Sequence, residues 1–158
     1  MRPGCIPSSI ASLAWHLGIP LSSRKTGSTW NGKDLSTALA GNDSDIVHDI
    51  AHWLVAPPSR RRCPDYGLGP DPNRSDVTHA RLLVSPDHAL REEELASALG
   101  VLLERALGMD WRDTLEMHGW ELSELPLDKL RARKLIDAAA RPVALRGLRA
   151  RRMPGGAA

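Results

Sequence analysis

The sequence predicts a compact, mainly α-helical fold, an α+β chain with little strand, on three observations. Apolar residues recur at helical spacing in about five or six segments. Most of these segments end at Gly or Pro, the residues that terminate helices. With 158 residues, the chain is also long enough to bury an apolar core without disulfides.

In the N-terminal part, a short helix is expected at 9–17, because Gly18 follows its last apolar residue. The next segment, 21–32, is polar and rich in glycine, which predicts a loop. A second short helix is expected at 34–40, ending at Gly41.

Two longer helices follow, and they are the clearest in the sequence. The first is capped by Asp43 or Ser44 and ends before Pro57, since the residue before a proline disfavours the helical conformation. The second runs over 87–107 and ends at Gly108. Each has one apolar face, formed by Ile46, Val47, Ile50, Ala51 and Leu54 in the first helix and by Leu95, Ala98, Leu99, Leu102, Leu103 and Ala106 in the second.

The other segments connect or follow these helices. Residues 57–78 hold several prolines and glycines and predict a long connection, which in a compact domain is usually functional or disordered. Residues 79–85 are expected to form a short strand or an extended lead-in. Further helices are expected at 110–117 and 127–139, each followed by Gly or Pro.

The chain is expected to form one domain over 1–140, followed by a basic, flexible tail over 141–158. Its net charge of +2 is too small to predict a nucleic-acid partner. No apolar run reaches the roughly 18 residues of a membrane span. Cys5 and Cys63 form neither a CxxC motif nor a disulfide framework, which indicates free thiols in a reducing compartment. Together these features predict a cytoplasmic protein.

Two histidines in the first long helix are the leading functional candidates. His48 and His52 are four residues apart. Residues at this spacing share one helix face, with Cβ atoms about 5–6 Å apart. Two imidazoles so placed can bind one metal ion, as in HExxH proteins. The alternative is a pair of incidental histidines, one buried and one exposed.

Asp49 stands where HExxH proteases have the glutamate that acts as general base on metal-bound water. Aspartate is one methylene shorter, so its carboxylate would lie farther from that water. The change disfavours a peptidase and leaves the metal ligands in place. Asp49 is instead expected to orient water, a substrate or a neighbouring arginine during catalysis.

A metal site needs a third ligand, and the start of the second long helix is acidic. The candidates there are Glu92, Glu93 and Glu94, followed by His79, His88 and Asp65 elsewhere. Two histidines and one carboxylate form the facial triad of non-haem Fe(II) oxygenases, which keeps positions open for O₂ and substrate. Acidic residues in a first helical turn also interact favourably with the helix dipole, which can explain part of the run by itself.

Residues 48–67 resemble the elongation factor P hydroxylases, iron-dependent enzymes that hydroxylate a modified lysine on that translation factor. The family pattern is an HExxHW helix, a short linker, paired arginines and an Asp-aromatic-Gly motif. The matching residues here are His48, His52 and Trp53, then Arg60 and Arg61, then Asp65, Tyr66 and Gly67. The similarity covers roughly positions 44–120, with Asp49 in place of the family's glutamate.

The resemblance implies that Glu93 is the carboxylate ligand, because the family's acidic helix start aligns there without a gap. Helical periodicity places Glu92 nearer the apolar face, so Glu92 stays an alternative. The resemblance also implies Fe(II) as the metal, with Zn(II) as second choice, and a protein side chain as substrate. Tyr66 is expected to be a catalytic, hydrogen-bonding lid over the site.

The sequence therefore predicts a non-haem iron-dependent oxygenase or hydroxylase with His48, His52 and Glu93 as metal ligands. One alternative is a zincin-like zinc hydrolase in which Asp49 or a nearby glutamate is the base. The other is a non-catalytic binding protein whose metal only braces the fold. Metal identity separates the first two, and turnover separates the third.

Overall fold

The computed structural model describes residues 8–24, 27–38, 42–69 and 81–132. In these residues the predicted fold class is confirmed, since helices dominate and the strands form one small three-stranded sheet. The His-bearing helix packs against the Glu-bearing helix, also as predicted. No helix within the described residues is long and apolar enough to cross a membrane.

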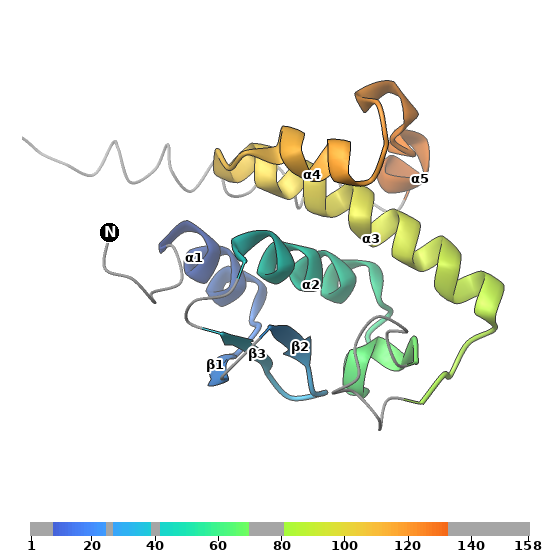
Figure 1. The fold of residues 1–158 in the computed structure, drawn as a ribbon. Coiled ribbons are helices and arrows are strands. Elements are labelled where there is room, and N and C mark those ends of the chain that lie inside the picture. Colours follow the sequence, from blue (N-terminus) through green and yellow to red (C-terminus); the bar gives the residue numbers. More distant parts are fainter. Residues whose placement is uncertain (1–7, 25–26, 39–41, 70–80, 133–158) are drawn as a thin grey trace, which may run out of the picture.

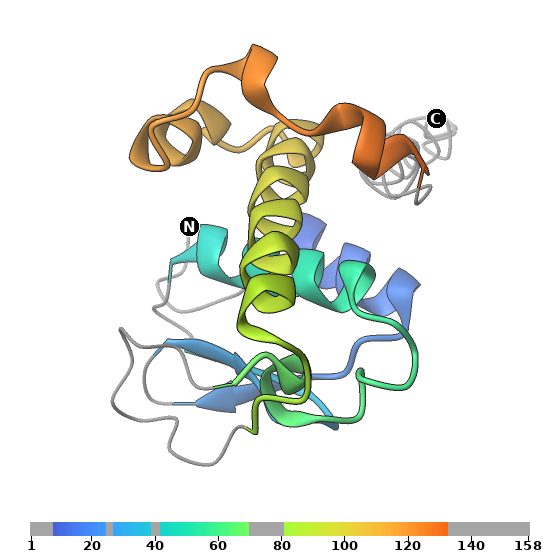
Figure 2. The ribbon, with the colours of Figure 1, turned by 90° about the vertical axis from the view of Figure 1, so that its right-hand side faces the viewer.

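The elements stack in layers (Figure 1). The helices are α1 (Ser8–Leu17), α2 (Asp43–Val55), α3 (Pro86–Leu107), α4 (Trp111–Met117) and α5 (Leu127–Ala132). The sheet lies on one side, with α1 and α2 over it, and α3 crosses α2 on the side away from the sheet. Figure 2 shows α4 and α5 on opposite sides of the C-terminal end of α3. The core therefore lies on both sides of α2.

The sheet corrects two sequence predictions, the loop at 21–32 and the helix at 34–40. Its strands are β1 (Leu21–Arg24), β2 (Ser28–Trp30) and β3 (Leu35–Ala38), with β3 in the middle, parallel to β1 and antiparallel to β2. Leu35 and Thr37 are fully buried, whereas Ser36 between them is only partly buried. The Ser36 hydroxyl lies 2.8 Å from that of Ser22 in β1. This alternation has the period of a strand.

The predicted positions of α2 and α3 are confirmed, with one change at the start of α2. Asn42 is its N-cap and accepts a hydrogen bond of 3.1 Å from the backbone N–H of Ser44. Helix α3 begins after Ser85, whose hydroxyl accepts from the backbone N–H of His88. It ends at Gly108, whose φ of 74° is readily adopted by glycine.

Helices α2 and α3 come close where Gly100 passes His48. A Cβ built on Gly100 would lie 3.7 Å from the Cα of His48, which is ordinary contact distance. The apolar faces of both helices are buried here, including Val47, Ile50 and Leu99. This packing fixes the register between the two helices and therefore between the side chains that they carry.

The predicted long connection contains turns and the short 3₁₀ helix η1 (Pro64–Gly67), and Leu68 then pairs with Leu82 in an isolated antiparallel bridge. The predicted helix at 110–117 is confirmed as α4. The extension of α5 to 139, the tail at 141–158, and Cys5 and His79 lie outside the described residues.

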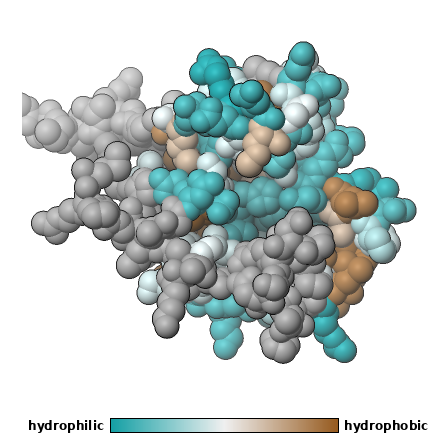
Figure 3. All heavy atoms as spheres, in the orientation of Figure 1, coloured by the Kyte–Doolittle hydropathy of each residue, from teal (hydrophilic) through white to brown (hydrophobic). Residues whose placement is uncertain are grey.

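Most of the coloured surface that Figure 3 shows belongs to polar residues. The hydrophobic atoms on it gather at the right-hand edge, on the side where α3 begins. Exposed leucines of this region are Leu82, Leu83 and Leu90.

Candidate metal site

His48, His52 and Glu93 converge where α2 crosses α3. The Nε2 atoms of the two histidines are 3.0 Å apart. One oxygen of Glu93 lies 3.1 Å from Nε2 of His48, and the other lies 3.0 Å from Nε2 of His52. Within the described residues, no other group of three or more His, Cys, Asp or Glu has this arrangement. The structure thus brings together the three residues that the sequence predicted as metal ligands.

Protons alone cannot satisfy these three short contacts. Each Nε2 carries either one proton or one lone pair, and an ionised carboxylate only accepts. If both Nε2 atoms are protonated, two N–H groups face each other across 3.0 Å. If one is not, its lone pair faces a carboxylate oxygen. A single cation that accepts a lone pair from all three groups removes this conflict, which is the chemical reason to regard them as a metal site.

The electrostatics of the cluster couple its members strongly. Burial would raise the pKa of Glu93, but the hydrogen bonds and charges of His48 and His52 outweigh it and hold that pKa far below 4.5. Burial acts to lower the pKa of His48, but the hydrogen bond and charge of Glu93 outweigh it, and the net result is a pKa above 6.5. Glu93 is therefore ionised at neutral pH, as a metal-binding carboxylate must be.

Ring stacking holds His52 in place. Its ring lies nearly parallel to that of Tyr66, with centroids 5.6 Å apart, and Tyr66 in turn stacks on Trp30. The Nδ1 atom of His52 is buried and has no hydrogen-bond partner among the described residues. Most metal-binding histidines are oriented by a hydrogen bond from that second nitrogen. Here the stack with Tyr66 takes over this role.

Tyr66, which the sequence predicted as a hydrogen-bonding lid, is buried beside His52 and is fixed from two sides. Its side chain is 2% exposed, and its hydroxyl donates a hydrogen bond of 2.7 Å to the backbone carbonyl of Asp49. The ring supports His52 from the interior, and the hydroxyl is engaged with α2. Tyr66 is therefore a positioning residue.

Asp49 is held toward the sheet. Its carboxylate accepts a hydrogen bond from the hydroxyl of Ser28, which lies in β2. Asp49 adjoins His48 in α2 but is not in the cluster with His52 and Glu93. The position of an HExxH general base is thus occupied by a shorter side chain that bonds to the neighbouring strand.

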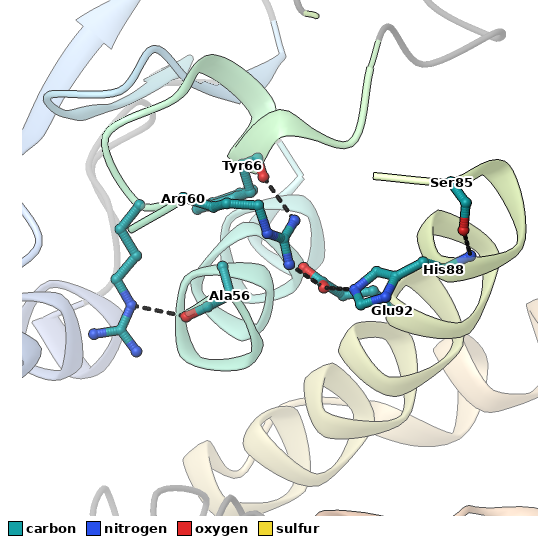
Figure 4. Close-up of polar contacts among 7 residues, drawn as sticks. Ala56, Arg60, Tyr66, Ser85, His88 and Glu92 are labelled. Atoms are coloured by element: carbon teal, nitrogen blue, oxygen red, sulfur yellow. Dashed lines mark hydrogen bonds and ion pairs between the residues drawn. The ribbon is translucent and has the colours of Figure 1, made fainter. Parts of the chain in front are cut away.

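Glu92 forms a second cluster beside the first (Figure 4). Its side chain is 3% exposed and pairs with the guanidinium of Arg60 and, at 3.1 Å, with Nε2 of His88. Arg60 also donates a hydrogen bond of 2.8 Å to the backbone carbonyl of Tyr66. Helical periodicity correctly indicated that Glu92 is buried, but the residue directed at the histidines is Glu93.

The remaining ligand candidates have other surroundings. Asp65 accepts a hydrogen bond from Thr29, and Glu94 is exposed. Sequence reasoning did not single out His118, which follows α4 and whose pKa is lowered by burial and by the charge of His48, against the charge of Glu93. No local pattern singles it out, because its position depends on how α4 packs.

The cluster is open on one side. His52 is only 7% exposed, whereas His48 is 32% and Glu93 is 51% exposed. A molecule can therefore approach from the side of His48 and Glu93. No protein-family model, curated protein or solved structure matches this chain. Its function is accordingly inferred from the chemistry of this site.

Proposed function

We propose that the chain is a non-haem Fe(II)-dependent oxygenase that hydroxylates a side chain, with His48, His52 and Glu93 as ligands. The observation that carries this proposal is the convergence of two Nε2 atoms and one carboxylate with an open side. This donor set is that of the 2-His-1-carboxylate oxygenases. The resemblance of residues 48–67 to elongation factor P hydroxylases supports the same chemistry.

Iron(II), when bound, supplies a redox centre at which O₂ can react. The reaction is balanced by an external two-electron reductant, for which ascorbate serves in an assay. One oxygen atom enters a C–H bond of the substrate, and the other leaves as water with two protons and the two electrons. The described residues form the ligand set, and the reductant comes from outside the protein.

The surrounding residues favour this reaction over hydrolysis. A zinc hydrolase needs a general base beside the metal-bound water. The candidate base, Asp49, is short and bonds to Ser28 in the sheet. This arrangement supports an oxygenase over a hydrolase.

The first experiment tests the metal site. Purified protein should bind one Fe(II) under anaerobic conditions, measured by calorimetry and by metal analysis after desalting. We expect His48→Ala, His52→Ala and Glu93→Ala each to abolish stoichiometric binding. His16→Ala is the matched control, because His16 is exposed on α1. Full retention of Fe(II) in the three site variants would show that the cluster does not bind metal.

The second experiment tests the reaction. Fe(II) protein, ascorbate and isotopically labelled O₂ are mixed with elongation factor P that carries its modified lysine. We expect mass spectrometry to find one labelled oxygen atom on the substrate and Zn(II) to inhibit the reaction. Zn(II) protein that cleaves peptides or esters, while the Fe(II) form consumes no O₂, would instead identify the hydrolase. Metal binding without either reaction would favour the metal-braced binding protein.

The proposal also includes the setting in which the protein acts. We place it in the cytoplasm, because Fe(II) and free thiols persist in a reducing compartment. Cys63 is a free thiol among the described residues. The partner would be a protein that presents one side chain to the open side of the cluster. Fractionation of cells that express the tagged chain would test the location.

A further inference from the structure

Two consecutive residues beside His52 adopt a backbone conformation that side chains disfavour. Asp65 has a φ of 43° and Tyr66 a φ of 56°, and both belong to η1. This left-handed region is uncommon for residues other than glycine, and most of all for bulky ones. Such a conformation costs free energy and persists only where the surrounding contacts impose it. The contacts that hold this turn therefore also hold the Tyr66 ring against His52.

Arg60 joins the turn to α3 through the two ends of one guanidinium (Figure 4). Its Nη1 atom donates a hydrogen bond of 2.8 Å to the backbone carbonyl of Tyr66, and its Nη2 atom pairs with the carboxylate of Glu92. The guanidinium is planar and presents its donors in a rigid fork. The two bonds therefore fix the backbone of Tyr66 relative to the first turns of α3.

Each acceptor of Arg60 leads directly to a metal ligand. The ring of Tyr66 lies against that of His52, with centroids 5.6 Å apart and planes within 15°. Because Nδ1 of His52 has no hydrogen-bond partner among the described residues, this stack is the contact that orients the imidazole. On the other side, Glu92 immediately precedes Glu93 in α3. Arg60 thus connects the support of one ligand to the helix that carries another.

We propose that Arg60 is a positioning residue of the metal site, which sets the spacing between His52 and Glu93 by bridging Tyr66 and Glu92. The inference rests on the proposed function, because it assumes that a metal ion occupies the cluster. Its distinguishing feature is that the planar fork matters in addition to the charge. Lysine supplies a positive charge as a compact ammonium on a flexible stem, so Arg60→Lys keeps a cation beside Glu92 and loses the fork.

Cobalt(II) binding to the full-length protein tests this inference, with calorimetry for the affinity and visible absorption for the geometry of the ligands. Arg60→Ala would leave Glu92 buried without a counter-charge, so Arg60→Lys is the variant to use. Changes to residues that orient metal ligands typically lower metal affinity by about 10–100-fold. We therefore expect Arg60→Lys to weaken cobalt(II) binding by about tenfold or more and to alter the absorption spectrum of the bound ion.

Arg61→Lys is the matched control, because the guanidinium of Arg61 lies over the ring of Trp53 and hydrogen-bonds to the backbone carbonyl of Ala56. It should keep the affinity and the spectrum of the wild type. Combining Arg60→Lys with Tyr66→Leu gives a second test, since both changes remove the same support of His52. The loss of affinity in the double variant should be smaller than the product of the two single losses.

The outcomes separate this inference from the proposed function. Equal cobalt(II) affinity and equal spectra in the wild type and Arg60→Lys would overturn the role of Arg60 and leave the metal site in place. Independent, fully multiplicative losses in the double variant would also overturn it, because Arg60 would then not act through Tyr66. A wild-type protein that binds no cobalt(II) would overturn the metal site itself, and this inference with it.

Discussion

Replacing Glu92 or Glu93 by glutamine should have different effects: the first should lower the stability of the fold, and the second should remove metal binding. Glu92 is 3% exposed, and it neutralises Arg60, whose side chain is 11% exposed. In Glu92→Gln that guanidinium keeps its charge and loses its counter-charge. Removing one partner of a buried ion pair costs about 3–5 kcal/mol. For a domain of this size, such a loss lowers the melting temperature by roughly 10 °C or more.

Glu93 is half exposed, and its partners are the two imidazoles, so Glu93→Gln should change the stability of the metal-free protein far less. It should instead remove stabilisation by metal, which is about 2.7 kcal/mol at a metal concentration one hundred times Kd.

Thermal unfolding followed by circular dichroism, with and without Fe(II) or cobalt(II), measures both effects. Glu94→Gln is the control, because Glu94 is exposed on the same turn. The reasoning is refuted if Glu92→Gln melts like this control, or if Glu92→Gln loses the metal-dependent shift while Glu93→Gln keeps it.

Three further predictions concern the surroundings of the site. Tyr66→Phe should keep metal affinity near the wild-type value, because the stack on His52 survives, whereas Tyr66→Leu should lower metal affinity by about 10–100-fold in calorimetry. The raised pKa of His48 stabilises the metal-free fold fully below pH 6.5 and progressively less at higher pH. The lowered pKa of Glu93 stabilises the fold above pH 4.5, and this contribution is lost as the pH falls. Urea titrations should therefore show this pair contributing most between pH 4.5 and 6.5, and Glu93→Gln should flatten the profile. Gly32→Ala should destabilise the fold by about 1–3 kcal/mol, since φ is positive there and a Cβ would lie 2.7 Å from the backbone carbonyl oxygen of Arg62; a melting temperature equal to the wild type would contradict this.

The long helices could be predicted because their signals are local. The apolar stripe and the Gly108 cap of α3 are contained in the sequence of the helix itself. The strands could not be predicted in the same way. β3 has four residues, and its alternation rests on Leu35 and Thr37 alone. Its partner β1 pairs in parallel from across the intervening β2 segment, and that long-range pairing decides the structure.

The same distinction applies to the site. The pairing of His48 with His52 follows from their spacing along one helix. The choice between Glu92 and Glu93 depends on Arg60, which lies 32 residues from Glu92 in sequence and binds it in the structure. Helical periodicity predicts which side chain is buried, and the buried one is Glu92, which pairs with Arg60. The more exposed Glu93 contacts the histidines.

The two clusters together determine the charge that a ligand would encounter. Adjacent ionised carboxylates repel each other, but Arg60 neutralises Glu92 within its own buried pair. Glu93 is therefore the carboxylate whose negative charge acts at the cluster with His48 and His52. With neutral imidazoles, a divalent ion and one carboxylate leave a net positive charge, and a bound cation is often the largest local charge in its site. The open side should therefore favour an anionic ligand, and azide should bind the metal-loaded protein more tightly than a neutral molecule of similar size does.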